Sequence, residues 1–222
     1  MVNFCPMLLK SLYRSLRGLF RYEMKFPTYA DSVRTRIFLS PDPVRYASLA
    51  LALERLTAEN VAGSFAEVGV WRGYTSRFMH DQAPNRKLYL FDTFSGFPSL
   101  YANDNGHERF RGTGVELVKR NIGNTEGVEF RVGIFPQTAG GLEDERFAFV
   151  LSDTDKYEPT RAALEFFYPR LSPGGYFMLH DYNSPESDHA IKRAADEFLR
   201  DKPEALIELP DVWGTALFRK QK

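Results

Sequence analysis

The sequence predicts an α/β fold built on a seven-stranded, mostly parallel sheet, and three patterns predict it. Short apolar runs alternate with helical stretches from residue 64 onward. Most of these runs are apolar throughout, which is typical of strands that helices cover on both faces. The last two runs follow one another through Pro210 and Asp211 without a helix between them. We therefore expect the sheet to end in a C-terminal antiparallel hairpin.

Seven segments have the apolar, β-branched or aromatic composition of strands. They are Phe65–Val70, Leu88–Phe91, Val128–Val132, Phe147–Leu151, Tyr176–Leu179, Leu206–Leu209 and Trp213–Phe218. The helices expected between and after them are Tyr74–Asp81, Val115–Asn121, Thr160–Tyr168 and Ser187–Leu199. Thr113 and Glu116 have the spacing of a capping box, and Gly123 is placed to end that helix. Residues 173–175 (Pro-Gly-Gly) predict a turn before the fifth strand.

Residues 1–60 are expected to form an N-terminal helical extension or lid, and residues 61–222 the main domain. Within the extension, apolar residues recur at helical spacing at Leu8, Leu9, Leu12, Leu16, Leu19 and Phe20. This amphipathic helix would pack on its own core or on a second copy in a homodimer; a helix lying on a membrane surface is the alternative. Residues 25–43, with three prolines, predict an irregular connector, and Val44–Ala58 predicts a helix.

Composition excludes several classes of protein. The 29 basic residues equal the 29 acidic ones, so no net field favours nucleic acid. Basic residues interrupt every apolar run near the N-terminus, and no run is long enough to span a bilayer, so we expect neither a signal peptide nor stable membrane insertion. The one cysteine, Cys5, has no partner for an internal disulfide. These features favour a cytoplasmic protein.

A glycine-containing turn joins the first predicted strand to the first helix of the main domain. Gly69 and Gly73 would let the backbone approach a ligand closely, and the helix start at Thr75 and Ser76 offers unpaired backbone N–H groups. Such a turn is typical of a nucleotide-type ligand site. The structural alternative is that the glycines serve packing alone.

Two acidic residues and a tryptophan indicate which ligand the turn would accept. Glu67 lies two positions before the first glycine, where a carboxylate would repel a pyrophosphate but suit a cationic ligand. Trp71 stands where a dinucleotide-binding turn usually has a glycine. Asp92 ends the second strand, 19 residues after Gly73, and is placed to accept hydrogen bonds from ribose hydroxyls or, alternatively, to cap a helix. A hydride-transfer enzyme using NAD is therefore disfavoured.

A second group of polar residues follows the fourth and fifth strands. Asp153 and Asp155 come after the fourth strand, and His180 and Asp181 come after the fifth. The carboxyl ends of neighbouring parallel strands meet at one edge of the sheet, so these side chains are expected to converge. Clustered carboxylates repel one another unless a cation joins them, and oxygen-rich sites suit Mg²⁺ or Mn²⁺. Solvated loop aspartates and a satisfied polar pair are the structural alternatives.

Several runs together resemble the macrocin O-methyltransferase family. They are FAEVGVWRG at 65–73, LYLFDTFSGFP at 88–98, DTDKYEPT at 153–160, PRLSPGG at 169–175 and HDY at 180–182. The resemblance covers roughly residues 60–185. It implies a Rossmann-like class I methyltransferase fold. It also implies an S-adenosylmethionine-dependent O-methyltransferase that modifies a hydroxyl of a sugar or glycosylated metabolite with the help of Mg²⁺.

The resemblance also implies roles for individual residues. Contacts with the cofactor would come from Glu67, Gly69, Trp71, Gly73, Thr75, Ser76, Asp92, Gly133, Phe135 and Asp153. Asp155 would be the general base. The metal ligands would be Asp153, His180 and Asp181.

One departure from the family pattern opens two mechanisms. The family usually has aspartate at the position of His180, and Mg²⁺ disfavours nitrogen ligands. His180 would then either ligate a softer ion such as Mn²⁺ or act as the general base in a metal-free site. A phenolic acceptor and a non-catalytic S-adenosylmethionine-binding protein remain alternative functions. The long connection at residues 93–127, which includes His107, is expected to select the acceptor.

Overall fold

The computed structural model describes residues 29–97 and 110–221, which fall into two compact units divided between Ser40 and Pro41. The smaller unit contains the helix α2 (Asp31–Leu39). The irregular connector predicted for residues 25–43 is therefore wrong over these nine residues, because the prolines flank the helix instead of interrupting it. The amphipathic helix predicted near residues 8–20, and the dimer contact assigned to it, lie outside the described residues.

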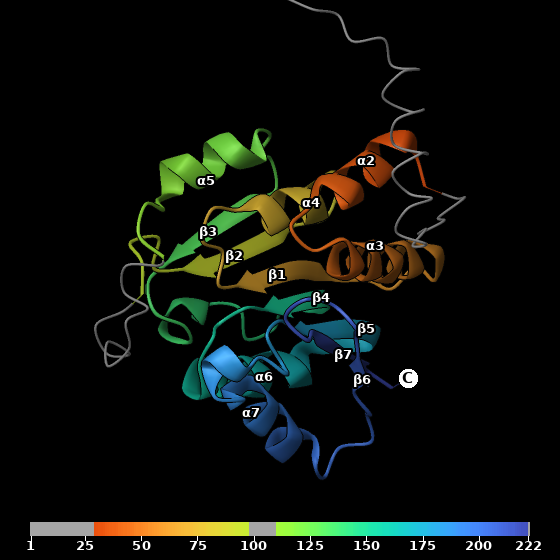
Figure 1. The fold of residues 1–222 in the computed structure, drawn as a ribbon, viewed down its shortest axis with the longest axis vertical. Coiled ribbons are helices and arrows are strands. Elements are labelled where there is room, and N and C mark those ends of the chain that lie inside the picture. The colour runs from red at the N-terminus through yellow and green to blue at the C-terminus, as the bar shows by residue number, and fades with distance from the viewer. Residues whose placement is uncertain (1–28, 98–109, 222) are drawn as a thin grey trace, which may run out of the picture. The chain divides into compact units, whose positions relative to one another are not determined.

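The larger unit is built on a seven-stranded sheet with the order β3-β2-β1-β4-β5-β7-β6 (Figure 1). The strands are β1 (Ser64–Val68), β2 (Leu88–Asp92), β3 (Val128–Val132), β4 (Phe147–Ser152), β5 (Leu171–Leu179), β6 (Ile207–Glu208) and β7 (Ala216–Arg219). The pairs among β1 to β5 are parallel, and β7 is antiparallel to both β5 and β6. The predicted mostly parallel sheet with a terminal antiparallel hairpin is confirmed.

Helices cover both faces of this sheet (Figure 1). They are α3 (Pro43–Ala58), α4 (Tyr74–Gln82), α5 (Val115–Ile122), α6 (Tyr157–Phe167) and α7 (Ala190–Leu199). The helices α3, α4 and α5 lie on one face, and α6 and α7 pack together on the other. The larger unit thus includes α3, which the predicted boundary at residue 60 assigns to the extension. That residues 1–60 act as a lid stays a prediction.

Two local predictions differ from the structure. Gly114, not Thr113, is the N-cap of α5; the Thr113 oxygen accepts no cap hydrogen bond from the helix, and its hydroxyl donates one to the carbonyl of Trp71. The segment 173–175 lies inside β5 and not before it, and the pairing of β4 with β5 shifts register nearby. In both places, a tertiary hydrogen bond or strand pairing overrides a local sequence signal.

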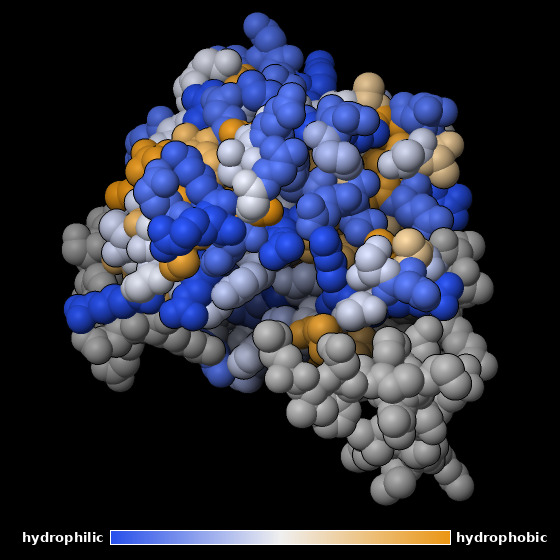
Figure 2. All heavy atoms as spheres, turned by 90° about the horizontal axis from the view of Figure 1, so that it is seen from above, coloured by the Kyte–Doolittle hydropathy of each residue, from blue (hydrophilic) through white to orange (hydrophobic). Residues whose placement is uncertain are grey.

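The sheet supplies most of the apolar core. Every residue of β1 and β4 is buried, and rings such as Phe147, Phe167 and Phe91 pack edge to face between β-strands and α6. Each fully buried side chain of this size stabilises the fold by about 1.5–3 kcal/mol. On the face shown in Figure 2, the described residues are mostly hydrophilic, and hydrophobic ones lie among them in small groups. Among the described helices, none is long and apolar enough to cross a membrane.

Candidate functional site

A cavity of 820 Å³ opens where the carboxyl ends of β1, β2, β4 and β5 meet. The strand order reverses direction from β1, with β2 on one side and β4 on the other, which is where open α/β sheets hold ligands. The predicted site residues that line this cavity are Glu67, Gly69, Trp71, Gly73, Thr75, Asp92, Gly133, Phe135, Asp153, Asp155, His180 and Asp181. Ser76 is fully buried and does not line it. The structure therefore brings two motifs that are distant in sequence into one site.

The turn after β1 requires glycine at its first position. Gly69 has a φ of 88°, and a Cβ there would lie 1.9 Å from the backbone oxygen of Asp153. The close approach is maintained by a hydrogen bond of 2.8 Å from the Asp153 N–H to the carbonyl of Val68. Because Gly69 has no Cβ, the chain at the end of β1 can approach the backbone of Asp153 after β4 closely.

The Asp92 carboxylate organises the same turn. Its Oδ2 accepts hydrogen bonds from the backbone N–H groups of Val70 at 2.7 Å and Trp71 at 2.9 Å, and its Oδ1 accepts one from Phe94 at 2.7 Å. Three charge-assisted hydrogen bonds of this length hold both connections after β1 and β2 in place. Asp92 also lines the cavity.

Gly73 lines the cavity, as the turn pattern suggests, and also has a packing role. It lies in the left-handed region at the N-cap of α4, and a Cβ there would lie 2.6 Å from Cγ1 of Val118 on α5. Close packing of α5 is therefore enough to require glycine at this position. Gly133 likewise has a φ of 137°, with Thr138 Cγ2 at 2.8 Å from the Cβ position.

Glu67 is a buried acid at the end of β1. Its side chain is 2% exposed and accepts a hydrogen bond from the Ser76 hydroxyl. Burial raises the pKa of Glu67 to about 8, and Asp153 adds to the rise, while Ser76 and Arg45 oppose it. The site therefore holds an acid that a cationic ligand would favour in its ionised form.

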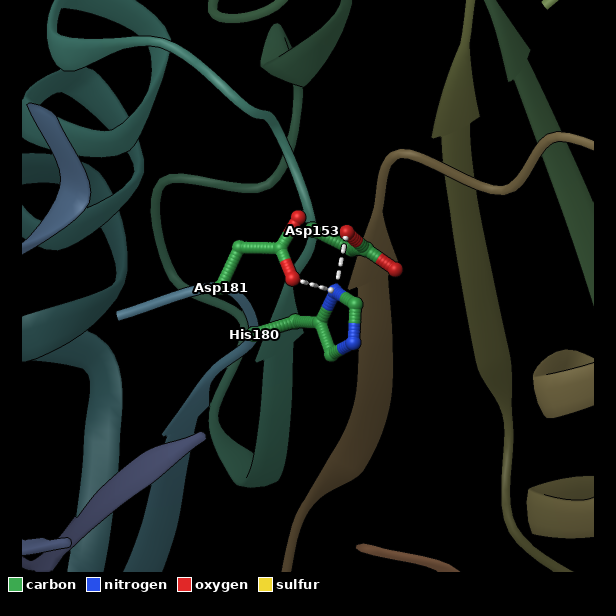
Figure 3. Close-up of side chains that lie close together, drawn as sticks. All are labelled: Asp153, His180 and Asp181. Atoms are coloured by element: carbon green, nitrogen blue, oxygen red, sulfur yellow. Dashed lines mark hydrogen bonds and ion pairs between the residues drawn. The ribbon is translucent and has the colours of Figure 1, made fainter. Parts of the chain in front are cut away.

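The side chains of Asp153, His180 and Asp181 form a compact cluster at the ends of β4 and β5 (Figure 3). His180 Nδ1 lies 2.8 Å from Oδ1 of Asp153 and 3.1 Å from Oδ1 of Asp181. The other ring nitrogen, Nε2, is on the opposite side of the ring from both carboxylates and is buried without a partner among the described residues. The imidazole is thus held in place through Nδ1, whereas Nε2 has no hydrogen-bond partner among the described residues.

Charge pairing sets the ionisation of this cluster. Burial opposes ionisation of Asp153, but His180 and Arg45 outweigh it, and the pKa of Asp153 is lowered. Burial likewise opposes a charge on His180, but Asp153 outweighs it, and the pKa of His180 is raised. Burial raises the pKa of Asp181. A carboxylate–imidazolium pair between Asp153 and His180 is the form that these directions favour.

Asp155 lies on the connection between β4 and α6 with a φ of 58°, in the left-handed region. A hydrogen bond joins its side chain to Asp181. Asp155 is therefore linked to the cluster, although it is outside the compact group of three.

Sequence patterns missed several residues of the cavity. Arg45 and Tyr46 of α3, Phe97 and Phe110 near the chain after β2, and Trp213 before β7 all line it. The helical pattern of Val44–Ala58 predicts that its charged residues face solvent. Arg45, however, is only 8% exposed. A charged residue in the first turn of a mostly apolar helix was the one available signal for Arg45.

Sequence comparison identifies the family of the chain. Residues 43–220 match the family described as Macrocin-O-methyltransferase (TylF). The chain belongs to the macrocin O-methyltransferase family. The match includes every residue of the cavity except Pro41, so the family relationship extends over the whole site.

Two named O-methyltransferases are similar to the chain in sequence. The 8-demethyl-8-(2,3-dimethoxy-alpha-L-rhamnosyl)-tetracenomycin-C 4'-O-methyltransferase of Streptomyces olivaceus is 33% identical over 158 residues, which are 62% of this chain and 60% of the relative. The mycinamicin III 3''-O-methyltransferase of Micromonospora griseorubida is 30% identical over 172 residues, which are 68% of each chain. The alignment thus spans three fifths of the first relative and about two thirds of the second.

Solved structures show the same fold. The O-methyltransferase NovP has a TM-score of 0.70 and 24% identity, covering 96% of this chain and 99% of that one. The calicheamicin methyltransferase CalS11 has a TM-score of 0.61 and 21% identity, covering 98% and 94%. The larger unit is therefore a class I O-methyltransferase fold, as the sequence predicts.

Proposed function

We propose that this protein transfers a methyl group from S-adenosylmethionine to a hydroxyl of a sugar on a glycosylated metabolite. The observation that carries the proposal is the single cavity that joins the turn after β1 to the Asp153–His180–Asp181 cluster. The tetracenomycin relative named above methylates a rhamnosyl-bearing compound, and this supports a sugar hydroxyl over a phenol as acceptor.

The cavity residues fit the cofactor. Glu67 offers a buried acid to a ligand that carries an ammonium and a sulfonium. Asp92 lines the cavity at the end of β2, where its carboxylate would meet ribose hydroxyls, and Gly69 lines it at the end of β1. Bound S-adenosylmethionine would supply an electrophilic methyl group. The protein's task is then to position an acceptor oxygen in line with that methyl group and to remove its proton.

We assign the removal of that proton to His180. Asp153 hydrogen-bonds Nδ1 of the ring, Asp181 lies 3.1 Å from the same atom, and Nε2 is left without a partner among the described residues. A base must be neutral before it accepts a proton, and the positive charge of the cofactor nearby favours the neutral imidazole. Asp155, linked to Asp181, is the alternative base that the family resemblance implies.

The same cluster also fits a divalent cation. Asp153, His180 and Asp181 each offer a ligand atom, and these atoms lie within 4.8 Å of one another. One imidazole nitrogen with two carboxylate oxygens suits Mn²⁺ better than Mg²⁺. A bound ion would lower the pKa of the acceptor hydroxyl. In that version Nδ1 of His180 has lost its proton, whereas in the metal-free version Nδ1 keeps it.

Calorimetry on chelator-treated protein tests the proposal. We expect S-adenosylmethionine to bind and NAD not to bind. A separate heat on adding Mn²⁺ that disappears in Asp153→Asn would support the metal version, and its absence would favour His180 as the base. If S-adenosylmethionine does not bind under any of these conditions, the proposed activity is wrong.

The acceptor class is tested by turnover. We expect methylation of a rhamnosylated aromatic polyketide and none of its aglycone or of a catechol, with S-adenosylhomocysteine as the measured product. His180→Gln should lower kcat by about 10²- to 10⁴-fold if His180 is the base, with affinity for S-adenosylmethionine unchanged. Methylation of the catechol alone would overturn the sugar assignment.

A further inference from the structure

Arg45 is a buried cation with few partners in the part of the chain that the structure describes. Its side chain is 10% exposed, and its backbone N–H donates to Asp42 at the start of α3. The guanidinium makes no hydrogen bond to any of the described residues, and its Nε is buried without a partner. Buried charges usually carry several hydrogen bonds, because an unpaired one is costly to remove from water.

Asp153 is the acidic group nearest to Arg45, but it leaves most of the guanidinium unused. Nη1 of Arg45 lies 3.9 Å from Oδ2 of Asp153, well beyond the 2.7–2.9 Å of a charge-assisted hydrogen bond. Asp153 is also already hydrogen-bonded to His180 at 2.8 Å. If Arg45 served only to neutralise Asp153, its other N–H donors would be left without an acceptor among the described residues.

The position of Arg45 is well defined and faces the cavity. The neighbouring Tyr46 hydroxyl hydrogen-bonds the Thr75 hydroxyl at 3.1 Å, and its ring packs edge to face on Phe78 of α4. This anchors the first turn of α3 beside the first turn of α4. Arg45, Tyr46 and Thr75 all line the cavity.

Arg45 and Glu67 bring a cation and a buried acid to the same cavity. Both line the cavity, and they are close enough that Arg45 lowers the pKa of Glu67. The amino-acid end of S-adenosylmethionine carries a carboxylate and an ammonium on one carbon atom, so it needs a cation and an acid side by side. A neutral sugar acceptor needs neither.

We propose that Arg45 binds the carboxylate at the amino-acid end of S-adenosylmethionine while Glu67 receives the ammonium. Guanidinium groups recognise carboxylates with two parallel hydrogen bonds, and the unused donors of Arg45 provide them. This inference rests on the proposed function, since it assumes that S-adenosylmethionine is the cofactor. Arg45 is then a cofactor-binding residue contributed by α3, outside the strand-end motifs.

Two ligands can distinguish carboxylate binding by Arg45 from other roles of this residue. S-adenosylhomocysteine has both the amine and the carboxylate, and its decarboxylated form keeps the amine alone. We expect wild-type protein to bind S-adenosylhomocysteine at least about 30-fold more tightly than its decarboxylated form, as measured by calorimetry. Similar affinities for the two ligands in wild-type protein would overturn the proposal without any variant.

Variants then assign the difference to Arg45. Arg45→Gln should weaken binding of S-adenosylhomocysteine by at least about 30-fold and that of the decarboxylated form by less than about threefold. Arg45→Lys, which keeps the charge and loses the fork of donors, should lie between. The control is Arg77→Gln, because Arg77 is half-exposed on α4 and pairs with Asp81; both affinities should stay unchanged.

Three results would contradict the role of Arg45. Equal weakening of both ligands in Arg45→Gln would mean that Arg45 acts through Asp153 or through packing. Unchanged binding of S-adenosylhomocysteine in Arg45→Gln would mean that the carboxylate lies elsewhere. Failure of wild-type protein to bind either ligand would refute the cofactor assignment itself, and this outcome differs from the other two.

Discussion

Two parts of the cavity wall are built by different means. The loop half, comprising Gly69, Trp71, Gly73 and Asp92, is shaped by main-chain hydrogen bonds and by positions where no Cβ fits. The charged half, comprising Arg45, Glu67, Asp153, His180 and Asp181, consists of buried or partly buried ionisable side chains, and all of them except Glu67 form ion pairs within the group. The first should therefore be sensitive to added volume and insensitive to pH, and the second should behave in the opposite way.

The largest expected effect is in the loop half. Gly69→Ala should reduce the free energy of unfolding by more than about 4 kcal/mol, because its Cβ would meet a backbone oxygen of Asp153 at 1.9 Å. Gly141→Ala is the matched control, since Gly141 has a φ of 82°, close to the 88° of Gly69, but nothing lies within 4 Å. It should cost about 1–2 kcal/mol from backbone strain alone. Equal losses in urea denaturation would show that the contact with β4 is unimportant.

The next effect is in the charged half and depends on pH. Burial raises the pKa of Glu67 from 4.5 to about 8 in the folded protein, so the folded state binds the proton more tightly than the unfolded state. The stabilisation that this provides is full below pH 4.5 and is lost as the pH rises to about 8, by about 1.4 kcal/mol per pH unit. Compared with Glu67→Gln, the wild-type protein should therefore become progressively less stable across this window.

Thermal or urea unfolding of both proteins from pH 5 to pH 8, without ligand, measures this difference. Arg45, Asp153 and Asp92 also contribute to the potential at Glu67, so only the difference between the two proteins is informative. A stability difference that stays constant over this range would show that Glu67 is ionised in the folded protein. It would also weaken the contrast between the two halves.

The smallest of the three effects is Asp92→Asn. The amide has one acceptor oxygen where the carboxylate uses both oxygens for three backbone N–H groups. We expect a loss of about 2 kcal/mol in the free energy of unfolding, nearly constant between pH 6 and 8. Asp188→Asn, at a side chain that is 94% exposed, should change stability by less than about 0.5 kcal/mol. A strong pH dependence for Asp92→Asn would place Asp92 with the charged half.

The sequence was sufficient for the sheet and for most residues around the cavity. Apolar composition and strand–helix alternation identify β1 to β5, because parallel strands covered by helices have few polar residues, and the absence of a helix between the last two runs identifies β6 and β7. The site follows from position alone, since residues just after parallel strands meet at one edge. Glu67, Asp153 and His180 were predictable for this reason.

Other features depend on contacts that no local pattern contains. The sequence pattern predicts that Gly73 faces a ligand. The structure adds that a Cβ at this position would clash with Val118 of α5. The sequence predicts that Asp92 accepts hydrogen bonds from ribose hydroxyls. It does not predict the three backbone N–H groups that Asp92 accepts from, because they depend on how the turns after β1 and β2 pack together. Arg45 was missed because a helical period classifies a charged residue as solvent-facing, whereas the start of α3 borders the cavity.

The position of β7 has a consequence for folding during synthesis. This strand follows β6 in the chain, yet it lies between β5 and β6 in the sheet. Until Ala216–Arg219 has been made, the edge of β5 from Tyr176 to Leu179 has no partner strand. An open apolar edge of this kind favours pairing between chains. The nascent protein should therefore depend on chaperones most between the synthesis of β5 and that of β7, although its cavity motifs have already been translated.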